Sequence, residues 1–395
     1  MQQARRTTGT VGAVGSVAVG SMVANLCMYV VHLTASAHFL DVSEYGQFAV
    51  LLSAMLVLGV PAMALQNVVA REVVLGRDEH RLRRLGLLST FWVVGLTVVA
   101  TPLVAALLRT EVATTAAALG SAPLLALVAA GQGLLQGRGE FRVLSWVLAA
   151  VGVLRSVPIV AAFAVGAGPA GGLWAGTVGT AVAAAVVWLV VWSVVGEART
   201  AGRVPPGAVG VLSVARASQV QLVLIVASSV DLLLSPQVLD SVEVGVYALG
   251  AIATKVAFWL PQAIGVVFYP RLADPARSRA SLRQAVTVVA GIGVVLTMLA
   301  GGAGPVVPLM FGDGYDELVP ILWLFAYIGA ALAVLQVVLL SAIARDRTRV
   351  ALGTWVVVAV EVLLILTVTG SIVAVAATAA VAVTIAALGT WAVAR

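Results

Sequence analysis

The chain has 395 residues, of which 61% are hydrophobic and only 10% are charged. A soluble globular domain is about a quarter charged, because it needs polar residues to cover its surface. This composition excludes a water-soluble fold. It favours an all-α polytopic membrane protein, since lipid solvates apolar side chains and leaves only backbone polarity to satisfy.

The formal charge of +6 does not indicate a nucleic-acid partner. The basic residues stand in short runs between apolar segments and form no basic face. Cys27 lies alone in an apolar stretch, so we expect neither a disulfide framework nor a metal site. The sequence contains no nucleophile–base pair, no Gly-rich phosphate loop and no metal-ligand cluster. We therefore expect no enzyme activity and no cofactor. The N-terminus, with Arg5-Arg6, has no removable signal peptide.

Polar and Gly/Pro punctuation divides the chain into twelve apolar segments. Each is near the length of about 20 residues that a helix needs to cross the hydrocarbon core. In chain order we expect helices at 12–36, 45–69, 85–108, 113–136, 143–166, 171–195, 213–235, 244–269, 284–303, 318–343, 350–369 and 372–394.

The distribution of cations predicts the orientation of these helices. If the N-terminus is cytoplasmic, all but three of the 23 basic residues fall in cytoplasmic segments. Short cytoplasmic loops are enriched in Lys and Arg, so this bias supports the assignment. The three exceptions are Arg109 in an outer loop and Arg155 and Lys255 within helices. We therefore predict a multi-pass protein of the inner (cytoplasmic) cell membrane with both termini in the cytoplasm.

Two helix starts carry one motif at an offset of 199 residues. Residues 41–49 (DVSEYGQFA) and 240–248 (DSVEVGVYA) both read D-x-x-E-x-G-x-[FY]-A. The chain therefore reads as two six-helix bundles, at 1–200 and 201–395, joined near Pro205-Pro206. With an even number of helices in each half, the pseudo-axis runs along the membrane normal. Transporters built in this way hold substrate near the midplane, between the halves.

Several segments resemble the multidrug/oligosaccharidyl-lipid/polysaccharide (MOP) exporter superfamily, in its polysaccharide-flippase branch. The resemblance covers nearly the whole chain. It implies a MATE-like architecture of two bundles around a central cavity, working by alternating access. The cargo in this branch is often a lipid-linked sugar, commonly on a polyprenyl pyrophosphate. The chain lacks the two additional helices of the lipid II flippases. The segments that carry the resemblance are VSEYGQFA at 42–49, LQGR at 135–138 with Phe141, Asp231 with GVYA at 245–248, Leu260-Pro261 with Tyr269-Pro270, and FGDGY at 311–315.

Four ionisable residues fall well inside the expected helices, where each costs about 3 kcal/mol unless it faces protein or water. Arg155 and Lys255, the only lysine of the chain, lie near the midplane. We assign both to substrate binding, because a guanidinium fork and an ammonium point charge suit pyrophosphate oxygens. Asp231 and Glu361 are candidates for gating, charge balance or proton relay. The alternative is that these residues form interhelical ion pairs, such as Asp231 with Lys255.

Weaker candidates are polar residues within the helices. His32, at the repeat-equivalent position of Asp231, is either a proton switch or a packing histidine. Neutral polar side chains either line a sugar path or hydrogen-bond neighbouring helices. They are Asn25, Gln66, Asn67, Gln132, Gln219, Gln221 and Gln262.

The sequence thus predicts a flippase or exporter that translocates a lipid-linked (polyprenyl-pyrophosphate) oligosaccharide or related polysaccharide precursor. The expected first six helices contain no Asp or Glu, and both midplane cations favour an anionic cargo. Two alternatives stay open. A cation-coupled drug or small-molecule antiporter of the same superfamily needs acids in its cavity, and a non-transporting scaffold of a glycan-assembly complex needs no polar cavity. The expected partners are the lipid-linked saccharide, the bilayer, and glycosyltransferases or a polymerase of a polysaccharide assembly pathway.

Overall fold

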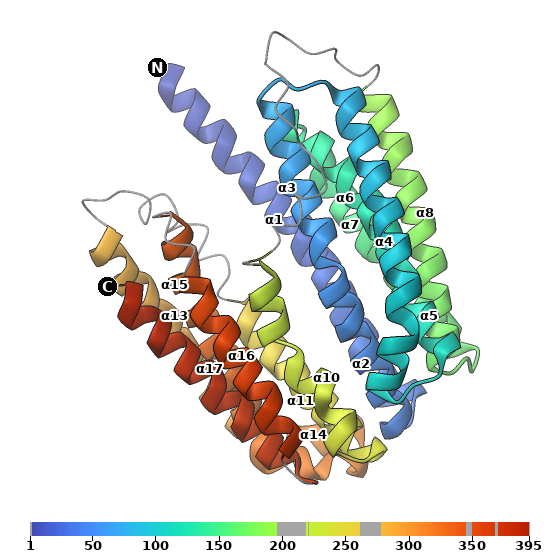
Figure 1. The fold of residues 1–395 in the computed structure, drawn as a ribbon, viewed down its shortest axis with the longest axis vertical. Coiled ribbons are helices and arrows are strands. Elements are labelled where there is room, and N and C mark those ends of the chain that lie inside the picture. The colour runs from blue at the N-terminus through green and yellow to red at the C-terminus, as the bar shows by residue number, and fades with distance from the viewer. Residues whose placement is uncertain are drawn as a thin grey trace. The chain divides into compact units, whose positions relative to one another are not determined.

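The computed structural model describes residues 2–195, 219, 221–260, 278–344, 350–367 and 370–394, all of whose regular structure is helical (Figure 1). Within these ranges eleven helices are long and apolar enough to cross a membrane, and a twelfth apolar helix, Leu352–Thr367, is shorter. The prediction of an all-α polytopic membrane protein with about twelve spans is confirmed.

The helices follow one another with short connections. In chain order they are α1 (Gln2–Thr34), the π-helix η1 (Ala35–Phe39), α2 (Val42–Leu58), α3 (Val60–Val74), α4 (Glu79–Leu108), α5 (Val112–Leu119), α6 (Ser121–Gly137), α7 (Phe141–Ala164), α8 (Pro169–Val195), α10 (Val230–Val238), α11 (Ser241–Trp259), α13 (Ser278–Ala303), α14 (Val306–Phe311), the 3₁₀-helix η2 (Asp313–Ile321), α15 (Leu322–Ala344), α16 (Val350–Thr367) and α17 (Ile372–Ala394).

Two of the expected spans are broken into two helices. The expected helix 45–69 divides at Gly59, the N-cap of α3, where Pro61 occupies one of the first positions. Proline has no backbone N–H and therefore suits the first turn of a helix better than its interior. The expected helix 113–136 divides at Gly120 into α5 and α6. In both cases the local sequence, not the apolar length, sets the end of the helix.

The chain forms two compact units, each described by itself. Unit 1 comprises Met1–Leu40, Leu58–Ala106 and Thr110–Gln219, and unit 2 comprises Asp41–Val57, Leu107–Arg109 and Val220–Arg395. This division differs from the predicted bundles 1–200 and 201–395, because α2 belongs to unit 2. The physical reason is the close packing of α2 on α11, described below.

Within unit 1, α7 packs against both α1 and α8, and α6 packs against α3 and α8. The centre of this unit is a cluster of fully buried aliphatic side chains that includes Leu65, Leu134 and Val187. Within unit 2, α15 packs against α11, α13 and α17, while α16 packs mainly against α10 and α17. These contacts place the ends and faces of α2, α10, α11 and α16 that carry the candidate site.

Candidate functional site

The repeated motif forms the same local structure at both of its occurrences. At the start of α2, the Glu44 amide donates to Asp41 Oδ1 at 2.7 Å, and the Asp41 amide donates to Glu44 Oε2 at 3.2 Å. At the start of α11, the corresponding bonds between Glu243 and Asp240 measure 2.9 and 3.0 Å. Each D-x-x-E is therefore a capping box, which satisfies two backbone donors of its helix end.

The glycine of each motif lies at the contact between α2 and α11. A Cβ placed on Gly46 would lie 2.7 Å from the backbone nitrogen of Gly245, and one on Gly245 would overlap the carbonyl oxygen of Val42. No side chain other than hydrogen fits there. This contact brings the deeper part of α2 alongside α11, where the lysine of the chain lies.

Lys255 of α11 is hydrogen-bonded to α2. Its Nζ donates to Ser53 Oγ at 2.9 Å, and Ser53 is fully buried while Lys255 is half-buried. Among the described residues, no acid lies within ion-pair distance of Lys255. The ammonium is thus held by a neutral hydroxyl, and the predicted alternative of a direct Asp231–Lys255 ion pair is not formed.

Asp231 of α10 is buried and takes its hydrogen bonds from other groups. Its Oδ2 accepts from the Tyr247 hydroxyl at 2.8 Å, and its Oδ1 accepts from the Leu232 amide at 2.8 Å. Tyr247 is itself fully buried and makes an edge-on contact with the ring of Phe325, with centroids 5.0 Å apart. Asp231 also interacts electrostatically with Lys255 across the packed helices.

Glu361 of α16 completes this group. It is only 4% exposed, and it lies within the electrostatic range of Asp231 and Tyr247, on a helix that packs against α10. In the part of the chain that the structure describes, no hydrogen bond or ion pair to the Glu361 carboxylate is formed. We call Ser53, Asp231, Tyr247, Lys255 and Glu361 the unit 2 polar cluster.

Two other candidates belong to unit 1 and are separate from this cluster. Arg155 lies in α7, half-buried and next to the buried Ser156. His32 is buried near the end of α1, and its carbonyl oxygen accepts a hydrogen bond from the Ser36 hydroxyl at 2.8 Å. The roles assigned to Arg155 and His32 stay predictions.

The neutral polar candidates have different surroundings. Gln66 Nε2 donates to Gln136 Oε1 at 3.0 Å, which links α3 to α6 and favours the packing interpretation for Gln66. Gln132 is buried and Gln221 half-buried, whereas Asn25, Asn67 and Gln219 are exposed. Gln262 lies outside the described residues. A role of these side chains along a sugar path stays a prediction.

The sequence analysis missed two buried acids in unit 1. It placed no Asp or Glu in the first six helices, but α3 extends to Val74 and contains Glu72, and α4 begins with Glu79. Glu79 forms a bidentate ion pair with Arg138, with bonds of 2.9 and 2.6 Å. Glu72 pairs with Arg77 at 2.6 Å. The family-like LQGR segment at 135–138 was the available signal, because it ends in this arginine.

The described residues contain no group of three or more His, Cys, Asp or Glu side chains that could hold a metal ion. The polar cluster can therefore bind an anion through Lys255, or accept a proton or monovalent cation at its two carboxylates. Both are properties that a transport site uses.

The fold is similar to those of solved transporters. The crystal structure of the eukaryotic MATE transporter AtDTX14 matches with a TM-score of 0.67 at 14% identity, over 97% of this chain and 95% of that chain. An inward-facing multidrug resistance MATE family transporter of the MOP superfamily matches with a TM-score of 0.67 at 13% identity, over 97% of each chain.

A third similar structure is a MOP superfamily transporter from Pyrococcus furiosus, with a TM-score of 0.58 at 13% identity, over 97% of this chain and 95% of that chain. It is described as having a binding pocket of reverse polarity that suggests a different function. No protein-family model and no curated protein matches the chain. The chain thus has the fold of the MATE transporters of the MOP superfamily.

Proposed function

We propose that this protein is a flippase of the inner membrane that translocates a lipid-linked oligosaccharide, or a related polysaccharide precursor, by alternating access. The cargo is an anionic lipid with a pyrophosphate head group. The fold similarity to MATE transporters supports transport as the class of function, and the cations within the helices support the anionic cargo.

The state of Lys255 is the observation that carries this proposal. Its ammonium is bonded to the neutral Ser53 hydroxyl, and no described carboxylate is close enough to neutralise it. A charge in a low-dielectric site interacts far more strongly than in water, so it attracts an anion strongly. Arg155 supplies a second cation, whose planar fork binds phosphate oxygens in pairs.

Asp231 and Glu361 have a different role in this proposal. Tyr247 and the Leu232 amide fix the carboxylate of Asp231, whereas Glu361 has no such partner among the described side chains. We assign these two acids to charge balance or proton relay while the cargo enters and leaves.

A second candidate function, a cation-coupled drug or small-molecule antiporter, is favoured by the composition of the same cluster. Two buried carboxylates on neighbouring helices accompany one lysine. Such a cluster binds a proton or cation as readily as an anion, and the transporters of similar fold include multidrug resistance proteins.

The test uses the purified full chain in proteoliposomes, with a fluorescent pyrophosphate-linked oligosaccharide as cargo. We expect Arg155→Ala and Lys255→Ala to insert at the wild-type level and to lose translocation. Arg155→Lys should restore little activity, because the fork is lost. Arg81→Ala, at an exposed arginine outside the cluster, is the matched control and should transport normally.

Three results would contradict the proposal. Normal translocation by a well-expressed Arg155→Ala/Lys255→Ala double variant would exclude cargo binding by these cations. Loss of protein level in Lys255→Ala, restored by adding Asp231→Ala, would assign Lys255 to structural charge balance. Proton-dependent drug efflux without any movement of the lipid-linked saccharide would establish the antiporter.

A further inference from the structure

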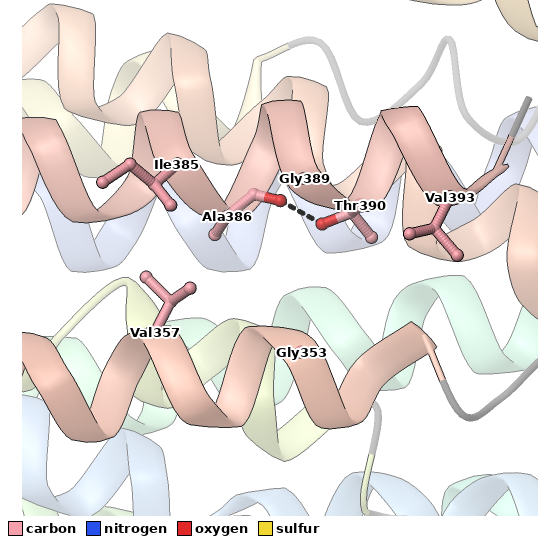
Figure 2. A pocket seen from close by; sticks show the side chains of 7 residues that line it. All are labelled: Gly353, Val357, Ile385, Ala386, Gly389, Thr390 and Val393. Atoms are coloured by element: carbon pink, nitrogen blue, oxygen red, sulfur yellow. Dashed lines mark hydrogen bonds between the residues drawn. The ribbon is translucent and has the colours of Figure 1, made fainter.

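A groove of about 420 Å³ lies between α16 and α17 in unit 2 (Figure 2). Gly353 and Val357 of α16 form one side, and Ile385, Gly389 and Val393 of α17 lie along the other. Thr390 also lines the groove, but its hydroxyl donates to the carbonyl oxygen of Ala386 in its own helix, as the dashed line shows. The groove therefore suits an apolar occupant.

The two glycines of the groove do not serve close helix packing. A Cβ placed on Gly353 or Gly389 would have no heavy atom within 4 Å. At Gly46 and Gly245, by contrast, the added atom would overlap backbone. The groove glycines thus keep open a space that larger residues would fill, and an empty apolar space loses the dispersion contacts that a hydrocarbon chain provides.

The position of the groove indicates a lipid with a negative head group. Gly353 is the fourth residue of α16 and Val393 the next-to-last residue of α17. Arg349 directly precedes α16, and Arg395 directly follows α17. Because adjacent Cα atoms lie 3.8 Å apart, both arginines are tied to the end of the helix pair at which the groove lies. Basic residues at the membrane surface attract anionic lipids.

The length of the groove favours a phospholipid over a long polyprenyl chain. The stretch from Ile385 to Val393 rises about 12 Å along its helix. One leaflet contributes half of the hydrocarbon core, which is about 30 Å thick. The groove therefore matches one acyl chain within one leaflet and does not extend across the membrane.

We propose that the groove between α16 and α17 binds one acyl chain of an anionic phospholipid of the cytoplasmic leaflet. The head-group phosphate of this lipid lies at the helix ends that adjoin Arg349 and Arg395. This lipid is a site-bound partner distinct from the transported cargo, so its binding does not depend on the proposed transport function.

The test is lipid titration of the detergent-purified full chain, followed by native mass spectrometry with phosphatidylglycerol and phosphatidylethanolamine. We expect the filled variant Gly353→Leu/Gly389→Leu to bind phosphatidylglycerol at least about tenfold more weakly, because leucine side chains replace the acyl contacts. Gly291→Leu is the matched control, since Gly291 of α13 is equally open. It should bind within about twofold of wild type.

The head group is tested separately. Arg349→Gln/Arg395→Gln should remove the preference for phosphatidylglycerol over phosphatidylethanolamine. If the double leucine variant unfolds earlier than wild type, Gly353→Ala/Gly389→Ala takes its place and should give an intermediate loss. Wild-type binding of phosphatidylglycerol by a folded filled variant would overturn the site. Equal binding of both lipids by wild type would overturn the charge selection, and displacement by an equal amount of polyprenyl phosphate would overturn the phospholipid assignment.

Discussion

Gly46 and Gly245 occupy equivalent positions in the two copies of the repeat, and their backbones are in contact. Each stands two positions after the glutamate of its capping box, so the two helices begin alike and meet at the same point of the motif. When equivalent positions touch, the pseudo-axis that relates α2 to α11 passes beside them. The internal repeat is therefore a packing device as well as a sequence pattern.

The first prediction concerns this contact. Gly46→Ala and Gly245→Ala should each destabilise the protein by about 1–3 kcal/mol or more, because the added methyl group collides with backbone that cannot rotate away. Equilibrium unfolding in mixed micelles measures the change. In Gly291→Ala, where the methyl group enters open space, the higher helix propensity of alanine should raise stability by about 0.5–1 kcal/mol. Equal changes at all three glycines would refute the contact.

The second prediction concerns the buried Glu79–Arg138 pair. The two side chains are 3% and 13% exposed, and the bonds are bidentate. Arg138→Ala should cost about 3–5 kcal/mol, since it leaves an uncompensated buried carboxylate. The double variant Glu79→Ala/Arg138→Ala should lose less than the two single losses combined. Arg81→Ala, where the side chain is 77% exposed, is the control and should cost under about 1 kcal/mol. Additive losses in the double-mutant cycle would contradict the pair.

The third prediction concerns the tyrosine of the unit 2 polar cluster. Tyr247→Phe removes the hydroxyl that donates to the buried Asp231, and should destabilise unit 2 by about 1.5–3 kcal/mol, because a hydrogen bond to a charged group is lost. Tyr327→Phe is the matched control, since the Tyr327 hydroxyl bonds only to the neutral Thr384 hydroxyl among the described residues. Its loss should be about 0.5–1.5 kcal/mol. A larger loss at Tyr327 than at Tyr247 would show that Asp231 does not need this donor.

The fourth prediction concerns the orientation derived from the cations. In a Cys27→Ser background, Asp313→Cys should react with an impermeant thiol reagent in intact cells, whereas Arg81→Cys should react only after lysis. Both positions are exposed in the structure, so burial does not account for a difference between them. Labelling of Arg81→Cys from outside would reverse the topology.

The sequence by itself determined the class of the protein and most of its helices. Composition sufficed for the membrane assignment, because few charges cannot cover a soluble surface. Apolar length gave the number of spans, since the bilayer thickness sets the length of a helix. The capping boxes at Asp41 and Asp240 were recognisable as a repeat because a cap is a local interaction, made within four residues. The helix break at Gly59–Pro61 was also visible locally, but it was given less weight than the apolar length.

The tertiary structure alone decided which groups are partners. The sequence marked Lys255 and Asp231 as a possible ion pair, yet Lys255 bonds to Ser53, which is 202 residues away, and Asp231 bonds to Tyr247. The sequence gives no register for such contacts, because the choice of partner depends on how α2, α10 and α11 pack. The same packing assigned α2 to unit 2, where a glycine on each helix lets the two backbones meet. Propensity and hydropathy act along one chain segment, whereas a buried charge is satisfied by whichever polar group the neighbouring helices bring to it.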